Sequence, residues 1–197
     1  MQRFRNDRWF IKRYQLADLY CQQDQIEQRC ILMRSCSNSI ESIPQIDFIF
    51  ENSNELVIRQ HYIEKDNSAT FSSYQRLAKD LDLMHKAGLV HGDLHPRNLI
   101  ISHGRCYIID FEPCYIQQRY NIRARMSSKF TWSELDRKEN KLTSLTDKVG
   151  FYKVVSLFHG SDEPALTLDF EKQLKDLNCQ NILEIIGNYN SFNPKMD

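Results

Sequence analysis

Glycine is scarce in this 197-residue chain and unevenly placed. Only six glycines occur, and the first of them is Gly88. Glycine lets backbone amides approach phosphate groups closely, because it has no side chain to clash. The stretch before Gly88 therefore contains no glycine-rich loop that could wrap the phosphates of a nucleotide.

Net charge and long apolar runs are also absent. The 26 basic and 26 acidic residues give a formal charge of zero. This balance removes the electrostatic basis for nucleic acid or an anionic membrane as the main partner. No stretch approaches the roughly 20 apolar residues that span a bilayer. The first ten residues also lack the apolar run of a signal peptide.

The cysteines show none of the spacings that mark disulfide scaffolds or metal sites. There are six, and no pair has C-x-x-C spacing. Metal binding by cysteine and histidine needs clustered ligands, and the sequence shows no cluster. We therefore expect reduced thiols in a cytoplasmic protein.

The residues that are present suffice for a packed core, with 41% hydrophobic and 11% aromatic residues. Up to residue 65, branched and aromatic runs predict strands, and a Gln-, Glu- and Leu-rich run predicts a helix. The predicted segments are a strand over 8–14, a helix over 16–33, a loop over 35–42, and strands over 45–50 and 55–61 joined by a turn at 51–54.

The rest of the chain predicts helices. Residues 68–87 form an amphipathic pattern, with Ser72 as the expected cap at its start and Gly88 at its end. Residues 146–155 predict a further helix, and residues 162–186 predict one or two more. No internal repeat or low-complexity linker is present.

One motif organises the chain. Residues 91–101 contain Asp93 and, five residues later, Asn98; Asp110 follows twelve residues beyond, at the end of an apolar strand. Phosphoryl transfer needs these groups: one carboxylate to receive the acceptor's proton, and an amide with a second carboxylate to hold magnesium. As isolated residues, both aspartates would instead be ordinary loop carboxylates. Their order and spacing resemble the catalytic core of the protein-kinase-like superfamily.

The resemblance implies a role for each of these residues. Asp93 would be the catalytic base, Asn98 would steady the loop and bind magnesium, and Asp110 would hold the magnesium that bridges the phosphates of ATP. His91 would shape the loop by donating to backbone carbonyls. Asp147, in the first turn of a predicted helix, would cap the backbone of the loop.

The resemblance is weaker in the first 65 residues. Lys12 resembles the lysine that grips the nucleotide phosphates, and Glu27 is the candidate partner that would anchor it, with Asp24 and Glu41 as rivals. Tyr62 and Ile63 would lie in the connector that bonds adenine.

The chain also departs from the family pattern. Gly92 stands where many regulated protein kinases have an arginine, and Glu112 replaces the glycine of Asp-Phe-Gly. Asp-Phe-Glu is more familiar from small-molecule kinases, as is Asp-Leu-His-Pro in the loop. The missing glycine-rich hairpin leaves three alternatives: a minimal kinase without it, an N-terminally truncated chain, or loss of nucleotide binding. Residues 115–130 fit an activation-segment-like loop or a plain solvated loop.

These features together predict an α+β, two-lobed fold with a reduced strand lobe over 1–65 and a mostly helical lobe over 66–197. The expected function is transfer of the γ-phosphoryl group of ATP to a hydroxyl with Mg²⁺. A small atypical serine/threonine protein kinase is the first choice, because few residues follow Asp110 to build a small-molecule pocket. A small-molecule or glycan kinase of the aminoglycoside-phosphotransferase type is the second, and a non-catalytic binding module with the kinase fold is the third.

Overall fold

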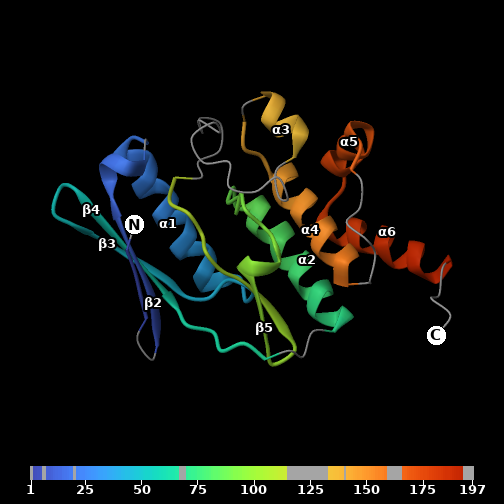
Figure 1. The fold of residues 1–197 in the computed structure, drawn as a ribbon, viewed down its shortest axis with the longest axis horizontal. Helices are drawn as coiled ribbons and strands as arrows, with labels where there is room; N and C mark the ends of the chain where they lie inside the picture. The colour runs from blue at the N-terminus through green and yellow to red at the C-terminus, as the bar shows by residue number, and fades with distance from the viewer. Residues whose placement is uncertain are drawn as a thin grey trace.

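The computed structural model describes residues 2–5, 8–19, 21–66, 70–114, 133–139, 141–158 and 166–192. Within these residues the molecule is elongated, with a sheet at one end and a group of helices at the other (Figure 1). None of the described helices is long and apolar enough to cross a membrane.

The sheet has four antiparallel strands in the order β1-β2-β4-β3. The strands are β1 (Gln2–Arg5), β2 (Trp9–Gln15), β3 (Ile46–Glu51) and β4 (Glu55–His61). Side chains alternate across a strand, so Lys12 and Tyr14 share the buried face of β2. The strands predicted from sequence are confirmed, and so is the turn between β3 and β4, where Asn52 has a φ of 63°.

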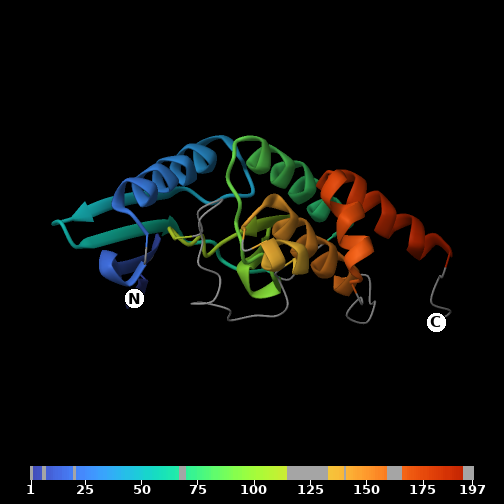
Figure 2. The same ribbon diagram turned by 90° about the horizontal axis from the view of Figure 1, so that it is seen from above.

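A long helix, α1 (Gln23–Ser39), lies along one face of the sheet and packs on β3 (Figure 2). A short 3₁₀ helix, η1 (Leu16–Leu19), precedes it. The buried face of α1 is formed by Ile26, Cys30 and Met33, which recur at three- and four-residue steps as an amphipathic helix requires.

The predicted bounds of this helix, 16–33, were wrong at both ends, because α1 begins only at Gln23 and continues to Ser39, through most of the expected loop over 35–42. Cys36 extends the buried face by another turn. Ser37 and Ser39 have low helix propensity, but their hydroxyls donate to the carbonyls of Arg34 and Ser35 within the helix. Burial thus outweighs local propensity here.

The helical lobe begins with α2 (Phe71–Lys86), which is capped at both ends. The N-cap is Thr70 rather than the predicted Ser72: its hydroxyl accepts from the Ser73 amide, and the Ser73 hydroxyl lies 3.2 Å from the Thr70 amide. At the other end, Gly88 has a φ of 88° and its amide donates to His85. This left-handed position is the reason for glycine there, as predicted.

The remaining elements complete the lobe. They are η2 (Pro96–Asn98), β5 (Leu99–Ser102), β6 (Arg105–Ile108), α3 (Glu134–Glu139), α4 (Ser144–Phe158), α5 (Leu168–Asp176) and α6 (Cys179–Phe192). Strands β5 and β6 form an antiparallel hairpin that packs on α2 through β6, and α6 packs on both α2 and α4.

The sheet lobe and the helical lobe share one continuous cluster of buried apolar side chains. The boundary expected at residues 65 and 66 falls in the irregular connector that follows β4. The segment between α2 and β5, called the 91–98 loop below, is anchored in this cluster, since Leu89 and Val90 before it and Leu94 within it are fully buried members.

Candidate active site

The 91–98 loop is held at its start by a carboxylate from α4. Asp147 accepts hydrogen bonds from the amides of His91 and Gly92, both at 2.7 Å, and lies 3.0 Å from His85 Nε2. The predicted capping of the loop by Asp147 is therefore confirmed. Burial alone would raise the pKa of Asp147, but the hydrogen bond from His85 and the loop amides hold it below its ordinary value.

His91 shapes the next part of the loop, as predicted. Its Nε2 donates to the Ile109 carbonyl at 2.8 Å, and its Nδ1 accepts from the Asp93 amide at 3.2 Å. A carbonyl can only accept and an amide can only donate, so these partners fix the neutral tautomer. Burial lowers the pKa of His91, which favours the same neutral ring. Gly92 beside it has a φ of 86°, a conformation that an arginine would adopt only with strain.

Asp93 and Asn98 are in direct contact. The Asn98 Nδ2 donates to the Asp93 carbonyl at 2.9 Å and lies 3.3 Å from Asp93 Oδ2. Because the amide nitrogen is used in this way, the Asn98 Oδ1 is the atom that can face a cation. His95 Nε2 lies 3.5 Å from Asp93 Oδ2, and the Asp93 side chain is 18% exposed. Asp93 is thus oriented yet accessible.

Asp110 follows the hairpin strand β6 in an unusual conformation. Its φ is 69°, a region that aspartate tolerates better than most residues and that is common at functional sites. Its amide donates to Gln60 Oε1 on β4 at 3.3 Å. Its carboxylate forms an ion pair with Lys12 on β2. The structure therefore brings Lys12 and Asp110 together, although they lie far apart in the sequence.

The predicted anchor of Lys12 was wrong. Glu27 is exposed on α1, and the described ion pairs of Lys12 go to Asp110 and to Glu112 Oε1, the latter at 3.1 Å. The rival candidates Asp24 and Glu41 are exposed as well. Residues three and four apart share one face of a helix, and the buried face of α1 through Ile26, Cys30 and Met33 leaves Glu27 outside it.

Arg29 is a residue that sequence reasoning missed. It is buried on α1, and its Nε donates to the Glu112 carbonyl at 2.7 Å while a terminal nitrogen donates to the Val90 carbonyl at 2.9 Å. Its position three residues after Ile26 and four before Met33 was the available signal, because this spacing places it on the buried face.

A pocket of about 520 Å³ lies between β4, the connector and the 91–98 loop. Its wall is lined by Phe10, Gln60, His61, Tyr62, Ile63, His95, Arg97, Asn98, Ile100, Ile109 and Asp110. Tyr62 and Ile63, predicted to meet adenine, thus share one pocket with Asn98 and Asp110, the predicted magnesium ligands. Ligand-binding pockets are typically of this size and of this mixed character, roughly 300–1,000 Å³ and mostly apolar with a few polar groups.

The donor set fits a magnesium-bound nucleotide. Magnesium takes oxygen ligands, and Asn98 and Asp110 offer an amide oxygen and a carboxylate on the same wall. Lys12 places an ammonium group beside Asp110, and an ammonium group is a charge that phosphates bind. Residues 115–130, expected to form an activation-segment-like loop, lie outside the described residues.

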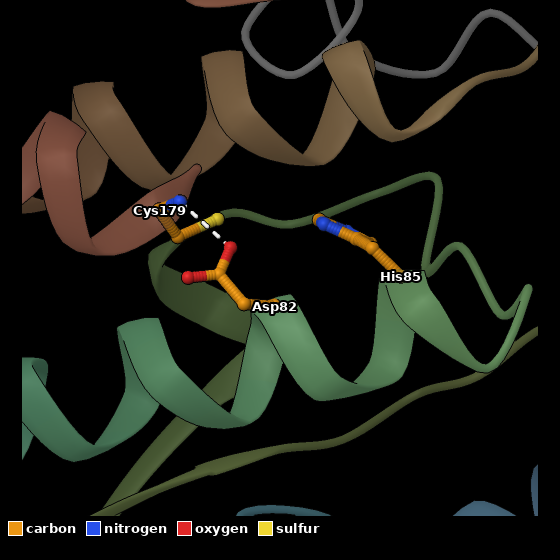
Figure 3. Close-up of side chains that lie close together, drawn as sticks. All are labelled: Asp82, His85 and Cys179. Carbon is orange, nitrogen blue, oxygen red and sulfur yellow. Dashed lines mark hydrogen bonds between the residues drawn. The ribbon is translucent and has the colours of Figure 1, made fainter. Parts of the chain in front are cut away.

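A second group of polar side chains lies between α2 and the start of α6 (Figure 3). Asp82, His85 and Cys179 offer possible ligand atoms within 4.8 Å of one another, a cluster that sequence spacing did not reveal. Asp82 accepts from the amides of Cys179 and Gln180 at the start of α6, at 2.7 and 3.3 Å. Burial raises the pKa of Cys179, which favours the thiol over the thiolate that metals bind. These contacts give the cluster a structural role as a helix cap.

The fold and the site define a member of the protein-kinase-like superfamily. Among solved structures, the chain is similar to the granulovirus kinase PK-1 of Cydia pomonella granulovirus, with a TM-score of 0.57 and 15% identity over 89% of this chain and 69% of that one. It is also similar to the PknI kinase domain of Mycobacterium tuberculosis, with a TM-score of 0.59 and 13% identity over 93% of this chain and 85% of that one. At such identity these similarities establish the fold alone.

Sequence comparison gives the family. The model of the phosphotransferase enzyme family (APH) matches residues 5–120, and the chain belongs to this family. It is 27% identical to the KEOPS complex subunit Bud32 of Pyrococcus abyssi over 113 residues, 51% of this chain and 50% of that protein. It is 54% identical over 28 residues, 14% of each chain, to a probable serine/threonine-protein kinase BUD32 homolog of Archaeoglobus fulgidus. The matches thus span half or less of these relatives.

Proposed function

We propose that this protein transfers the γ-phosphoryl group of ATP to a hydroxyl group, with Mg²⁺ as cofactor. The observation that carries the proposal is a connected set of four side chains from both lobes, two of which line the pocket. Lys12 pairs with Asp110, Asp110 and Asn98 line the pocket, and Asn98 hydrogen-bonds to Asp93. A family member without catalysis would have no need for this complete set.

Each side chain has a separate task in the proposed reaction. Asp93 accepts the proton of the acceptor hydroxyl, and the contact with Asn98 orients it. Lys12 draws the phosphate groups toward β2. Magnesium, when held by Asn98 and Asp110, supplies positive charge that offsets the charge on the phosphates. Tyr62 and Ile63 offer their backbone to the adenine.

For the acceptor, we propose a serine or threonine hydroxyl of a protein. The Archaeoglobus fulgidus relative, a probable serine/threonine-protein kinase, supports this choice. A small-molecule hydroxyl is the second candidate, and a specific observation favours it. The matched family model is that of the phosphotransferase enzymes, and the Glu112 that follows Asp110 is typical of kinases that act on small molecules.

The test is phosphate transfer from radiolabelled ATP to a panel of acceptors, with casein and the chain itself beside choline and sugars. Asp93→Asn keeps the size of the side chain and removes the base, so transfer should fall by roughly 10²- to 10⁴-fold. Asp169→Asn, on exposed α5, is the matched control and should keep full activity. The affinity for Mg²⁺-ATP should be unchanged in both.

Two results would contradict the proposal. If Asp93→Asn transferred phosphate as fast as the wild type, Asp93 would not be the base. If Mg²⁺-ATP raised the melting temperature of the wild type but no acceptor were phosphorylated, the chain would be a nucleotide-binding module.

A further inference from the structure

A group of buried charged side chains lies behind the pocket. None of its carboxylates comes from α1, where the sequence had predicted the partner of Lys12. Lys12, Arg29 and Glu112 are only 3%, 6% and 9% exposed. A buried charge is costly unless it is paired and hydrogen-bonded. The contacts that satisfy these three residues therefore define how the phosphate side of the site is built.

The helix α1 contributes a cation to this group instead of a carboxylate. Arg29 reaches inward from the buried face of α1, whereas Glu27 points to solvent. Arg29 donates to the carbonyls of Glu112 and Val90, so its guanidinium joins the segment after β6 to the start of the 91–98 loop. The carboxylate that Lys12 needs must come from elsewhere.

Two carboxylates meet Lys12, and they cannot have the same role. Asp110 lines the pocket and is the proposed magnesium ligand, so its pairing with Lys12 is replaced when a cation binds. Glu112 lies farther from the pocket, is not among its lining residues, and keeps its contact with Lys12 at 3.1 Å. Glu112 is therefore the carboxylate that can hold Lys12 throughout.

Tyr14 closes the group from the same face of β2. Burial, followed by the neighbouring carboxylates of Glu112 and Asp110, raises the pKa of Tyr14, so the phenol stays protonated. A neutral phenol adds no further negative charge beside Glu112 and Asp110.

We propose that Glu112 is the positioning residue that anchors Lys12 toward the nucleotide phosphates, and that Arg29 fixes Glu112 in place through its backbone. This inference rests on the proposed phosphotransferase function. It assigns the anchoring role to Glu112, two residues after Asp110, and not to a residue of α1. The anchoring role then explains why this chain has a glutamate where protein kinases have the glycine of Asp-Phe-Gly.

The experiment compares Glu112→Gln with Glu27→Gln, the matched control on α1, by steady-state kinetics with Mg²⁺-ATP. Loss of a charge-assisted contact should raise KM for ATP about tenfold or more in Glu112→Gln, with a smaller change in kcat. Glu27→Gln should match the wild type. Equal KM values for Glu112→Gln and the wild type would overturn the inference.

A double-variant cycle separates positioning from general support of the fold. If Glu112 acts through Lys12, adding Glu112→Gln to Lys12→Met should cause no further loss of ATP binding. A further loss as large as in the single variant would show a merely structural role. If Glu112→Gln fails to fold, Glu112→Asp, which keeps the charge but shortens the reach, should still raise KM.

A readout without nucleotide distinguishes failure of this inference from failure of the proposed function. Nitrogen-15 NMR of the Lys12 ammonium measures how fast its protons exchange with water. Exchange should be faster in Glu112→Gln than in the wild type or Glu27→Gln. If the wild type does not bind ATP but exchange still responds in this way, only the proposed function fails. If exchange does not respond, the anchor itself is wrong.

Discussion

Two groups of buried charge lie on either side of the 91–98 loop, and they are built differently. On the sheet side, Lys12 is held by the side chains of Asp110 and Glu112. On the helical side, Asp147 is held mainly by backbone amides of the loop, with His85 as its side-chain partner. The first group joins side chains that can exchange partners. The second fixes the course of the chain itself.

The difference shows which carboxylates can take part in ligand binding. Asp147 is completely buried and cannot turn away without leaving two amide donors unpaired, which costs about 1–3 kcal/mol for each buried group. Asp110 is partly exposed, with 22% of its side chain accessible, and Lys12 retains Glu112 if Asp110 moves. Asp147 thus stabilises the loop from one side, while Asp110 on the other side can take part in ligand binding.

The largest expected effect is at Asp147. Asp147→Ala should lower the free energy of unfolding by about 3–5 kcal/mol, because it breaks a buried charged network and leaves donors unpaired. Urea unfolding followed by circular dichroism measures this change. Asp169→Asn, at an exposed ion pair on α5, should leave the free energy of unfolding essentially unchanged. A loss below 1 kcal/mol in Asp147→Ala would mean that the loop does not depend on this carboxylate.

A smaller effect is expected at Gly150, where α4 packs directly against the loop. A Cβ at Gly150 would lie 2.3 Å from the Leu94 carbonyl oxygen. Gly150→Ala should therefore push α4 from the loop and cost about 1–3 kcal/mol. In Gly187→Ala on α6, where the nearest atom is at 3.9 Å, better helix propensity should instead add about 0.5–1 kcal/mol. Thermal melts of the two variants test the contrast, and equal shifts would contradict it.

The pH dependence should follow from His91. Its folded-state pKa is lowered by burial, so the unfolded chain takes up the proton first as the pH falls below about 6.5. The stabilisation is present above that pH and is lost below it, by at most about 1.4 kcal/mol per pH unit for one proton. Unfolding titrations between neutral and mildly acidic pH measure the slope. His91→Asn should flatten it, and exposed His103→Gln should not.

The smallest effect on stability is expected at Asp110. Asp110→Asn should lower the free energy of unfolding far less than Asp147→Ala does, because Lys12 retains Glu112 and the Asp110 side chain is partly exposed. The same variant should lose the stabilisation by Mg²⁺-ATP, which in the wild type is about 2.7 kcal/mol at 100 times the dissociation constant. Melting curves with and without the ligand measure both. A loss of stability without ligand as large as in Asp147→Ala would contradict the difference described between the two groups of buried charge.

Much of this arrangement follows from local sequence. The spacing of Asp93, Asn98 and Asp110 is local to one motif, and the resemblance of that motif to the kinase catalytic core implied the capping role of Asp147. The ends of α1 could not be predicted, since burial of Cys36 overrides the serine-rich composition around it. Local propensity carries no information about such tertiary contacts.

The anchor of Lys12 was missed for a related reason. Its partner is 100 residues away in Glu112, and choosing between Glu27 and Glu112 depends on how α1 is rotated against the sheet. The apolar residues Ile26 and Met33 do indicate this rotation, because a helix that buries them also places Arg29 on its buried face and Glu27 on its exposed face. Glu112, which stands where protein kinases have the glycine of Asp-Phe-Gly, was the second clue.

The backbone partners of Arg29 have a consequence for mutational tolerance. A carbonyl oxygen is the same whichever residue carries it, so no substitution at Val90 or Glu112 can compensate for the loss of Arg29. Position 29 should therefore accept almost no other residue and should show no covariation with its partners. Lys12 and Glu112 meet through side chains, and a paired exchange there could restore a contact. Saturation mutagenesis should then find that position 29 tolerates almost no substitution on its own. The effects of substitutions at Lys12 and Glu112 should depend on each other.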